Sequence, residues 1–454
     1  MRKAWENMST EEKQEARFNT WLSGDHIQFV SSEARDAYRR RITRLKDAVQ
    51  LRKVPDRVPI FQVFTFMPVT LFDATPGEVM YDGRKLVSVW KKFLAEYDPD
   101  FYMSPAPVFH GPVLEKLGYK QYRWPGYNLS EKYPYQYIED EYMKPDEYHL
   151  LIDDPSDFLL RTYLPRICES LGSFESLLSL SGILALPTLV PFLVKLGSPE
   201  VQDSLKTLLE VGRAASAWFK DINNFEREAH EMGFVNGVGG STRAPFDVIG
   251  DTLRGTQGII VDMYRNPGQL LKAIERVTPL MIRAGLAGAS QSANPIVFIP
   301  LHKGADGSMS DHHFRTFYWP SLRELILGLV NEGCVPLLFA EAGYNSRLEY
   351  IRELPKGHCI WMFDRTDMAK AKETVGETTC IGGNIPVSKM LSGTPEQIRN
   401  ICKDLMDVAG KNGGYIMSCG SSMDEARADT LHAMIDFAKE YGIYQPPGEK
   451  IEYS

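Results

Sequence analysis

The chain has 454 residues, 43% of them hydrophobic and 24% charged, which is the composition of an ordinary globular protein with enough length for a large core. Its net charge of −8 and the lack of any lysine/arginine cluster with interleaved aromatic residues exclude a nucleic-acid partner. The first 18 residues carry charges throughout, which excludes a secretory signal, and six scattered cysteines without a CxxC pair favour a reduced, cytoplasmic protein.

Helical periodicity dominates the N-terminal part of the chain. Residues 31–53 start with a serine suited to cap a helix and continue with strong helix formers. We therefore expect an N-terminal helical extension over residues 1–55. The main domain is expected over residues 56–445, and a polar tail over residues 446–454.

Eight short apolar runs follow, and each predicts a strand. They lie at residues 59–64, 99–104, 233–238, 295–301, 335–340, 358–363, 378–383 and 413–418. The last five runs alternate with helical patterns, which indicates a parallel sheet covered by helices. Eight such units predict an α/β fold, a (β/α)₈ TIM barrel. A doubly wound sheet is the weaker alternative, because no GxGxxG motif follows an early strand.

The glycine-rich sequence GVGGST lies at residues 237–242. A glycine run of this kind is weak evidence for phosphate binding. It more often allows a bend or a close approach of two backbones.

A large insertion, at about residues 105–230, separates the second strand from the third. Its tyrosine-rich part, residues 126–152, predicts an accessory hairpin. Residues 176–194 carry no charge, but Pro187 and Pro191 favour buried helices over a membrane span, with an apolar lid or a subunit interface as the alternative. We expect the insertion to lie over the mouth of the barrel. No membrane contact is expected, and the sequence does not decide between a monomer and a homodimer.

Function is expected at the C-terminal ends of the strands. There, His302, Glu341 and Cys419 follow three different strands and offer the nitrogen, oxygen and sulfur donors that zinc accepts, so they predict a zinc-type metal site. The same end of the barrel supplies the predicted catalytic residues Glu341, Asp364 and Tyr344. Predicted substrate-binding residues are Gln62, Arg243, Asp306 and Asn384.

Simpler structural roles compete with these predictions. Cys419 also fits a small buried hydrophobic residue, and His302 fits a surface position. Glu341 also fits a cap of the following helix, because a carboxylate is favoured at a helix N-terminus. Asp364 and Asp367 precede another helix, and we predict that Asp367 caps it.

Two stretches resemble the uroporphyrinogen decarboxylase family. Residues 382–434 contain that family's strand ending in GN and P, a GTPEE-like helix start, a GG-hydrophobic strand and a cluster before the last helix. Residues 237–277 are similar to its glycine-rich strand, the following helix and a short MY-x-x-P segment. The resemblance covers roughly residues 55–440 and implies a (β/α)₈ barrel, in agreement with the eight runs.

The resemblance distinguishes two chemistries. Decarboxylases of the family grip their substrate with an arginine-rich loop after the first strand, whereas residues 62–72 contain no arginine. The corrinoid-linked methyltransferases, similar to methylcobalamin:coenzyme M methyltransferase, bind zinc through an HxC motif and a final cysteine. Cys419 matches that cysteine, but the place of the HxC motif is taken by Ala340-Glu341-Ala342. A site built from His302, Glu341 and Cys419 would therefore be a variant of the family's zinc site.

The second branch implies a cobalamin-dependent methyltransferase. It would move a methyl group between a small organic substrate, such as a methoxy-aromatic or another O- or N-methyl compound, and a corrinoid. No corrinoid-binding DxHxxG-type stretch occurs, so we expect cobalamin to be carried by a separate corrinoid protein. A carboxylate ligand in place of a thiolate would make zinc a stronger Lewis acid toward an ether oxygen. The alternatives are a decarboxylase or lyase of the same superfamily, and a non-catalytic small-molecule binding protein.

Overall fold

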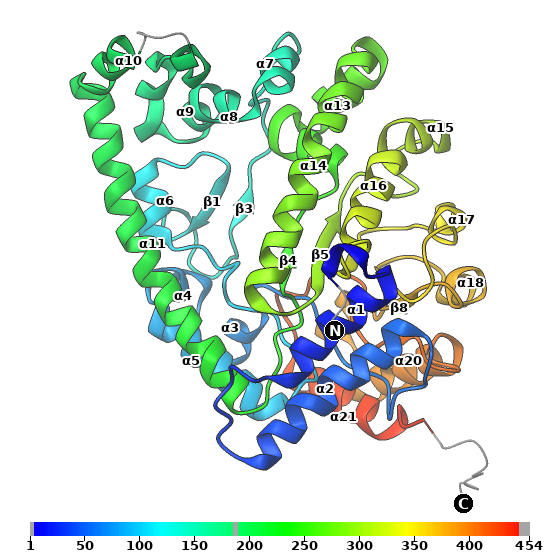
Figure 1. The fold of residues 1–454 in the computed structure, drawn as a ribbon. Coiled ribbons are helices and arrows are strands. Elements are labelled where there is room, and N and C mark those ends of the chain that lie inside the picture. Colours follow the sequence, from blue (N-terminus) through cyan, green and yellow to red (C-terminus); the bar gives the residue numbers. More distant parts are fainter. Residues whose placement is uncertain (1–3, 185–188, 445–454) are drawn as a thin grey trace, which may run out of the picture.

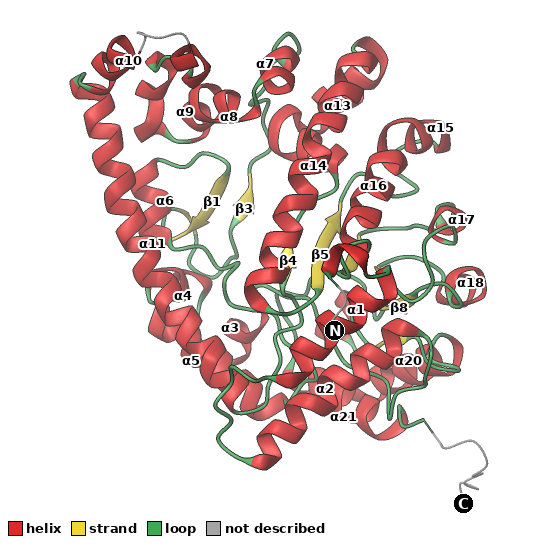
Figure 2. Ribbon diagram, viewed as in Figure 1, coloured by secondary structure: helices red, strands yellow, loops and turns green. Residues whose placement is uncertain are grey.

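A parallel sheet lies at the centre of the structure, surrounded by helices (Figure 2). This computed structural model describes residues 4–184 and 189–444. Six strands pair in the order β4-β5-β6-β7-β8-β9. They are β4 (Gly240–Ser241), β5 (Ile296–Leu301), β6 (Val335–Ala340), β7 (Ile360–Phe363), β8 (Cys380–Gly382) and β9 (Tyr415–Ile416).

The first two predicted runs join the two edges of this sheet. They do so through isolated parallel bridges, which pair Ile60 with Met417, Phe61 with Phe101, and Tyr102 with Asn236. The backbone N–H of Phe61 donates to the carbonyl oxygen of Met417 at 3.1 Å. All eight predicted runs thus lie side by side in one parallel arrangement, and the predicted (β/α)₈ barrel is confirmed.

Helices follow the runs in turn and cover the outside of the barrel (Figure 1). After the first run come α3 (Met67–Leu71), α4 (Pro76–Tyr81) and α5 (Gly83–Tyr97). After β4 and β5 come α12 (Pro245–Asp247), α13 (Gly255–Arg265), α14 (Pro267–Ser292), α15 (Asp311–His313) and α16 (Trp319–Val330). The last strands are followed by α17 (Leu348–Ile351), α18 (Met368–Val375), α19 (Val387–Ser392), α20 (Pro395–Val408) and α21 (Ala428–Tyr441).

The strands are buried on both faces, as their continuous apolar sequences predict. All six residues of β6 are buried, and β6 pairs with β5 in a register that runs from Ile296 opposite Val335 to Leu301 opposite Ala340. The glycine run after the third predicted strand lets α14 approach the sheet. A Cβ atom on Gly240 would lie 2.8 Å from the backbone of Ala289. Of the two roles expected for this glycine run, a bend or a close backbone approach, the structure shows the close approach.

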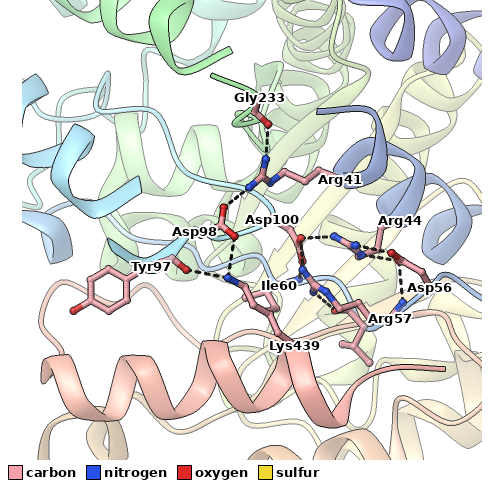
Figure 3. A network of polar contacts seen from close by, with 11 residues as sticks. Arg41, Arg44, Asp56, Arg57, Ile60, Tyr97, Asp98, Asp100, Gly233 and Lys439 are labelled. Atoms are coloured by element: carbon pink, nitrogen blue, oxygen red, sulfur yellow. Dashed lines mark hydrogen bonds and ion pairs between the residues drawn. The ribbon is translucent and has the colours of Figure 1, made fainter. Parts of the chain in front are cut away.

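Two N-terminal helices, α1 (Thr10–Ser23) and α2 (Ser32–Gln50), precede the barrel. The predicted serine cap is present, since the Ser31 hydroxyl accepts a hydrogen bond from the N–H of Ala34. Helix α2 is attached to the N-terminal ends of the first two runs by a charged network (Figure 3). In it, the buried Asp100 carboxylate accepts hydrogen bonds from Arg44, Arg57 and the backbone N–H of Ile60.

The insertion between the second and third runs contains helices and a small separate sheet. The helices are α6 (Gly111–Leu117), α7 (Tyr148–Asp153), α8 (Pro155–Phe158), α9 (Leu164–Ile167), α10 (Leu189–Leu196) and α11 (Pro199–Glu231). The sheet has the order β2-β1-β3, with β1 (Tyr122–Pro125), β2 (Asn128–Leu129) and β3 (Gln136–Tyr137). The hairpin expected within residues 126–152 thus begins earlier, because its longest strand, β1, precedes that range.

The prediction of buried helices over residues 176–194 is wrong for the helices of the described part, although Leu177 before them is buried; residues 185–188 lie outside the described residues. Short helices form at Leu180–Leu184 and in α10, but neither has a buried residue. Leu184 is 90% exposed and Val194 is 69% exposed. Helix α10 lies at the outer end of the insertion, beside the start of α11 (Figure 1). Among the described residues, no helix is long and apolar enough to cross a membrane. The predicted tail, residues 446–454, lies outside the described residues.

Candidate functional site

Two cavities lie at the C-terminal end of the barrel. The first, which we call the aromatic cavity, has a volume of about 630 Å³. It is lined by Phe109, Tyr119, Gln121, Tyr122, Tyr137, Glu139, Tyr163, Arg243, Asp251, Thr252, His302 and Lys303. The second, which we call the polar cavity, has a volume of about 700 Å³. It is lined by Asn345, Asp364, Arg365, Thr366, Asp367, Asn384, Pro386, Val387, Ser388 and Ser421.

His302 follows β5 and is held in place by two aspartates. Its Nδ1 lies 2.5 Å from Oδ2 of Asp251, and its backbone N–H donates to Oδ2 of Asp247 at 3.0 Å. Asp247 is buried and also accepts a hydrogen bond from the hydroxyl of Tyr318 at 2.8 Å. Lys303 adds an ion pair to Asp251 at 2.9 Å. The imidazole is therefore fixed through Nδ1, which leaves Nε2 as the nitrogen available to a ligand.

The charges of this group favour a protonated imidazole. Burial opposes the charged form of His302, but the hydrogen bond and the charge of Asp251 outweigh it and raise the pKa of His302. Burial likewise opposes ionisation of Asp251, yet His302 and Lys303 lower the pKa of that carboxyl group. Burial and the charge of Asp251 raise the pKa of Asp247 to about 6. His302 and Asp251 therefore resemble an imidazolium–carboxylate ion pair.

Glu341 lies across from His302 at the end of β6. Its Oε1 is 3.9 Å from Nε2 of His302, and its side chain is 41% exposed. It makes no hydrogen bond with the described residues and caps no helix. Burial raises the pKa of Glu341; His302 and Arg243 oppose this rise, and Asp364 adds to it. Glu341 thus keeps the position predicted for it at the functional end of the barrel.

The predicted zinc ligands are not brought together as a set. Within the described residues, no group of three or more His, Cys, Asp or Glu side chains is placed to hold a metal ion. Cys419 is buried, its Sγ lies 3.8 Å from Sδ of Met423, and burial raises the pKa of its thiol. Ala340 and Ala342 offer no side-chain donor. The donors therefore do not fit the three-ligand site, and zinc stays a prediction through which we derive no step.

Three other predicted residues have structural contacts. The side-chain amide of Gln62 donates to Val63 O at 2.8 Å and accepts from the N–H of Cys419 at 2.7 Å. The Asp306 carboxylate accepts from the N–H and the hydroxyl of Ser346, which fixes the loop after β6. Tyr344 is fully buried, with its ring 6.2 Å from that of Trp361. Their predicted substrate-binding and catalytic roles stay predictions.

Asp364 and Asn384 lie together in the polar cavity. The Asp364 carboxylate accepts from the N–H of Ala342 at 3.0 Å. The amide of Asn384 donates to the carbonyl oxygens of Asp364 and Thr366 at 2.8 and 2.7 Å. Asp367 accepts hydrogen bonds from the first turn of α18, so its predicted role as a helix cap is confirmed.

Sequence reasoning missed the residue that orients His302. Asp251 lies in a π-helical turn, Val248–Arg254, that follows the third strand. The only signal in the sequence is the spacing of Asp247 and Asp251, four residues apart directly after a strand, which places both on one helix face. The tyrosine-rich stretch at residues 126–152 predicts an accessory hairpin and supplies Tyr137 to the cavity. Tyr119, Tyr122 and Tyr163 lie outside that stretch and reach the cavity only through the folding of the insertion.

Comparison with known proteins identifies the family. A sequence model of the family named uroporphyrinogen decarboxylase (URO-D) matches residues 212–441, about half of the chain. The chain belongs to the uroporphyrinogen decarboxylase family. No curated protein matches it significantly. A solved structure described as a methyltransferase from Methanosarcina mazei is similar with a TM-score of 0.56, and the match covers 88% of this chain and 98% of that one. The two sequences are 14% identical, so this similarity concerns the fold.

Proposed function

We propose that this member of the family is a methyltransferase. It would transfer a methyl group from a small O-methyl or N-methyl compound to the reduced cobalt of a corrinoid carried by a separate protein. The observation that carries the proposal is the placement of the His302–Asp251 pair in the wall of a cavity at the C-terminal end of the barrel. The similar fold of a methyltransferase from Methanosarcina mazei supports it.

Transfer from an O-methyl compound needs a proton at the leaving oxygen. The carbon–oxygen bond breaks, and its electron pair stays on the oxygen. Cobalt in its Co(I) state supplies the electron pair for the new bond to the methyl carbon and becomes Co(III). Nε2 of His302 donates a proton to the oxygen, and solvent returns one to the imidazole.

The surrounding residues support this role of His302. Asp251 accepts the hydrogen bond from Nδ1, which fixes the orientation of the ring and stabilises its protonated form. Glu341 lies 3.9 Å from Nε2, the nitrogen that would donate the proton. Lys303 is bound to Asp251 and to the hydroxyl of Thr256, so it holds the aspartate rather than the substrate.

The charged side chains at the mouth of the barrel do not favour decarboxylation of a substrate with several carboxylates. Residues 62–72 contain no arginine. In the aromatic cavity, Arg243 is the one arginine of the lining, and Lys303 is already paired. Several substrate carboxylates would therefore lack charge-assisted partners there.

The proposal is tested by incubating the purified chain with cob(I)alamin and single methyl compounds: methoxybenzoates, methanol and methylamines. The absorption spectrum should change from that of Co(I) to that of methyl-Co(III), and the change should be abolished or greatly slowed in His302→Ala. An unchanged spectrum with every compound, both with free cobalamin and with a corrinoid protein encoded near this chain, contradicts the proposal.

A further inference from the structure

Arg243 is an exposed cation in the lining of the aromatic cavity. Every other charged group of the lining has a partner: His302 and Lys303 bind Asp251, and Glu139 binds the backbone and hydroxyl of Thr256. Arg243 makes no hydrogen bond or ion pair with the described part of the chain, although it lines the same cavity. A guanidinium is always charged near neutral pH and presents a planar fork of donors that matches a carboxylate. A ligand with a carboxylate would supply the partner that the chain does not.

Arg243 shares the lining of the cavity with Tyr122 and His302. Burial raises the pKa of Tyr122, and the positive charge of Arg243 opposes this rise. Burial also raises the pKa of Glu341, and Arg243 opposes that rise as well. The guanidinium is thus near both an aromatic ring of the insertion and the carboxylate that faces His302.

The rings of the aromatic wall pack on one another. The ring of Tyr122 packs edge-to-face on Phe109 at 5.5 Å, on Tyr135 at 5.2 Å and on Tyr137 at 5.4 Å between centroids. The hydroxyl of Tyr137 donates to the carbonyl oxygen of Asp251, which ties the wall to the turn that orients His302. Rings fixed in this way offer flat apolar surfaces on which an aromatic ligand can pack without ordering mobile side chains.

We propose that the substrate is a methoxy-substituted aromatic carboxylate, with its carboxylate bound by Arg243, its ring on the tyrosine wall and its ether oxygen facing His302. This inference rests on the proposed methyl transfer for the identity of the reacting group. The carboxylate and the ring follow from the lining of the cavity itself. The products would be the corresponding hydroxy-aromatic carboxylate and the methylated corrinoid.

Calorimetric titration without any corrinoid tests the inference separately from methyl transfer. We expect 2-, 3- or 4-methoxybenzoate to bind, and the neutral methoxybenzyl alcohol of the same geometry to bind more weakly. Arg243→Gln should weaken binding of the carboxylate by roughly 10- to 100-fold, the range for a lost hydrogen bond to a charged group, and leave the alcohol unchanged. Arg243→Lys should retain part of the difference, because it keeps the charge but not the fork.

Arg323→Gln is the matched control, because Arg323 is an exposed residue of α16 outside both cavities. It should bind like the unaltered chain. Equal binding of carboxylate and alcohol, or an unchanged affinity in Arg243→Gln, overturns the inference. Absence of binding for all three methoxybenzoates overturns it too, even if methyl transfer from methanol or a methylamine is observed. Binding without methyl transfer would instead support the substrate class and contradict the proposed reaction.

Discussion

The two ends of the barrel differ in whether their charged side chains are paired. At the N-terminal end, Asp100 is buried and bound to Arg44 and Arg57 (Figure 3). At the C-terminal end, Arg243 has no partner in the described part of the chain, and Glu341 has no hydrogen bond there. A buried charge is tolerated where it is paired, whereas a charge left open beside a cavity can bind a ligand. The charges at the N-terminal end therefore stabilise the fold, and those at the C-terminal end are free to bind and act on a ligand.

The largest effect is expected at the C-terminal end, from His302→Ala. Loss of a general acid typically slows a reaction by about 10²- to 10⁴-fold, and we expect a decrease of this size in the rate of methyl transfer. The fold should be retained, because Lys303 still pairs with Asp251 when the imidazole is removed. The rate is measured from the appearance of methylcobalamin. The exposed His312 on α15 provides the control, and equal rates for His302→Ala and His312→Ala would contradict the assignment.

At the N-terminal end, Asp100→Ala should break the charged network. It leaves Arg44 and Arg57 without their shared buried partner, and removal of one member of a buried ion pair costs about 3–5 kcal/mol of stability. Urea unfolding measures the change. Asp203→Ala, which removes an exposed partner of Lys206, should leave the free energy of unfolding nearly unchanged. Similar urea midpoints for Asp100→Ala and Asp203→Ala would show that the network does not stabilise the N-terminal end of the barrel.

The pH dependence of stability should reveal His230, near the same end of the molecule on α11. Burial, followed by the charge of His26, lowers the pKa of His230 to about 4. In the unfolded chain, His230 takes up a proton near pH 6.5, whereas in the folded chain it does so only near pH 4. The contribution of neutral His230 to the free energy of unfolding is therefore fully present above pH 6.5 and is lost as the pH falls toward 4, by at most about 3 kcal/mol.

Unfolding free energies measured between pH 7 and pH 4 test this expectation. His230→Gln should remove this part of the pH dependence, and His312→Gln should keep it. A pH dependence that is unchanged in His230→Gln would contradict the role of His230.

The smallest effect is expected from removal of metal. Since the described residues place no third donor beside His302 and Glu341, dialysis against a chelator should leave the rate of methyl transfer unchanged. Elemental analysis of the purified chain gives the complementary measurement. About one zinc per chain, lost in both Cys419→Ala and Glu341→Ala, would restore the metal site predicted from the sequence.

Much of the fold could be predicted because its signals are local. Continuous apolar runs such as residues 335–340 form buried parallel strands wherever helices cover both faces. The exposure of Leu180–Leu184 and of α10 could not be predicted, because an apolar sequence does not reveal whether another layer packs on it. The positions of Glu341 and His302 at strand ends follow directly from the strand pattern.

The chemistry of the candidate site depends on contacts that sequence spacing does not encode. The direction of the Cys419 side chain is decided by neighbours such as Met423, and its backbone is fixed by Gln62 from the opposite end of the chain. Asp251, which contacts His302, lies in a π-helical turn, and a regular helical pattern gives no sign of such a turn.

Transfer of a labelled methyl group tests the central claim most directly. Compounds carrying a ¹³C-methyl group, namely methoxybenzoate, methanol and methylamine, are supplied in turn with the chain and cob(I)alamin, and the products are followed by NMR. We predict that the label of at least one compound appears on cobalt, in equal amount to the demethylated product, and that His302→Ala suppresses both. Release of carbon dioxide without transfer of the label, or no reaction of any compound, would contradict the account.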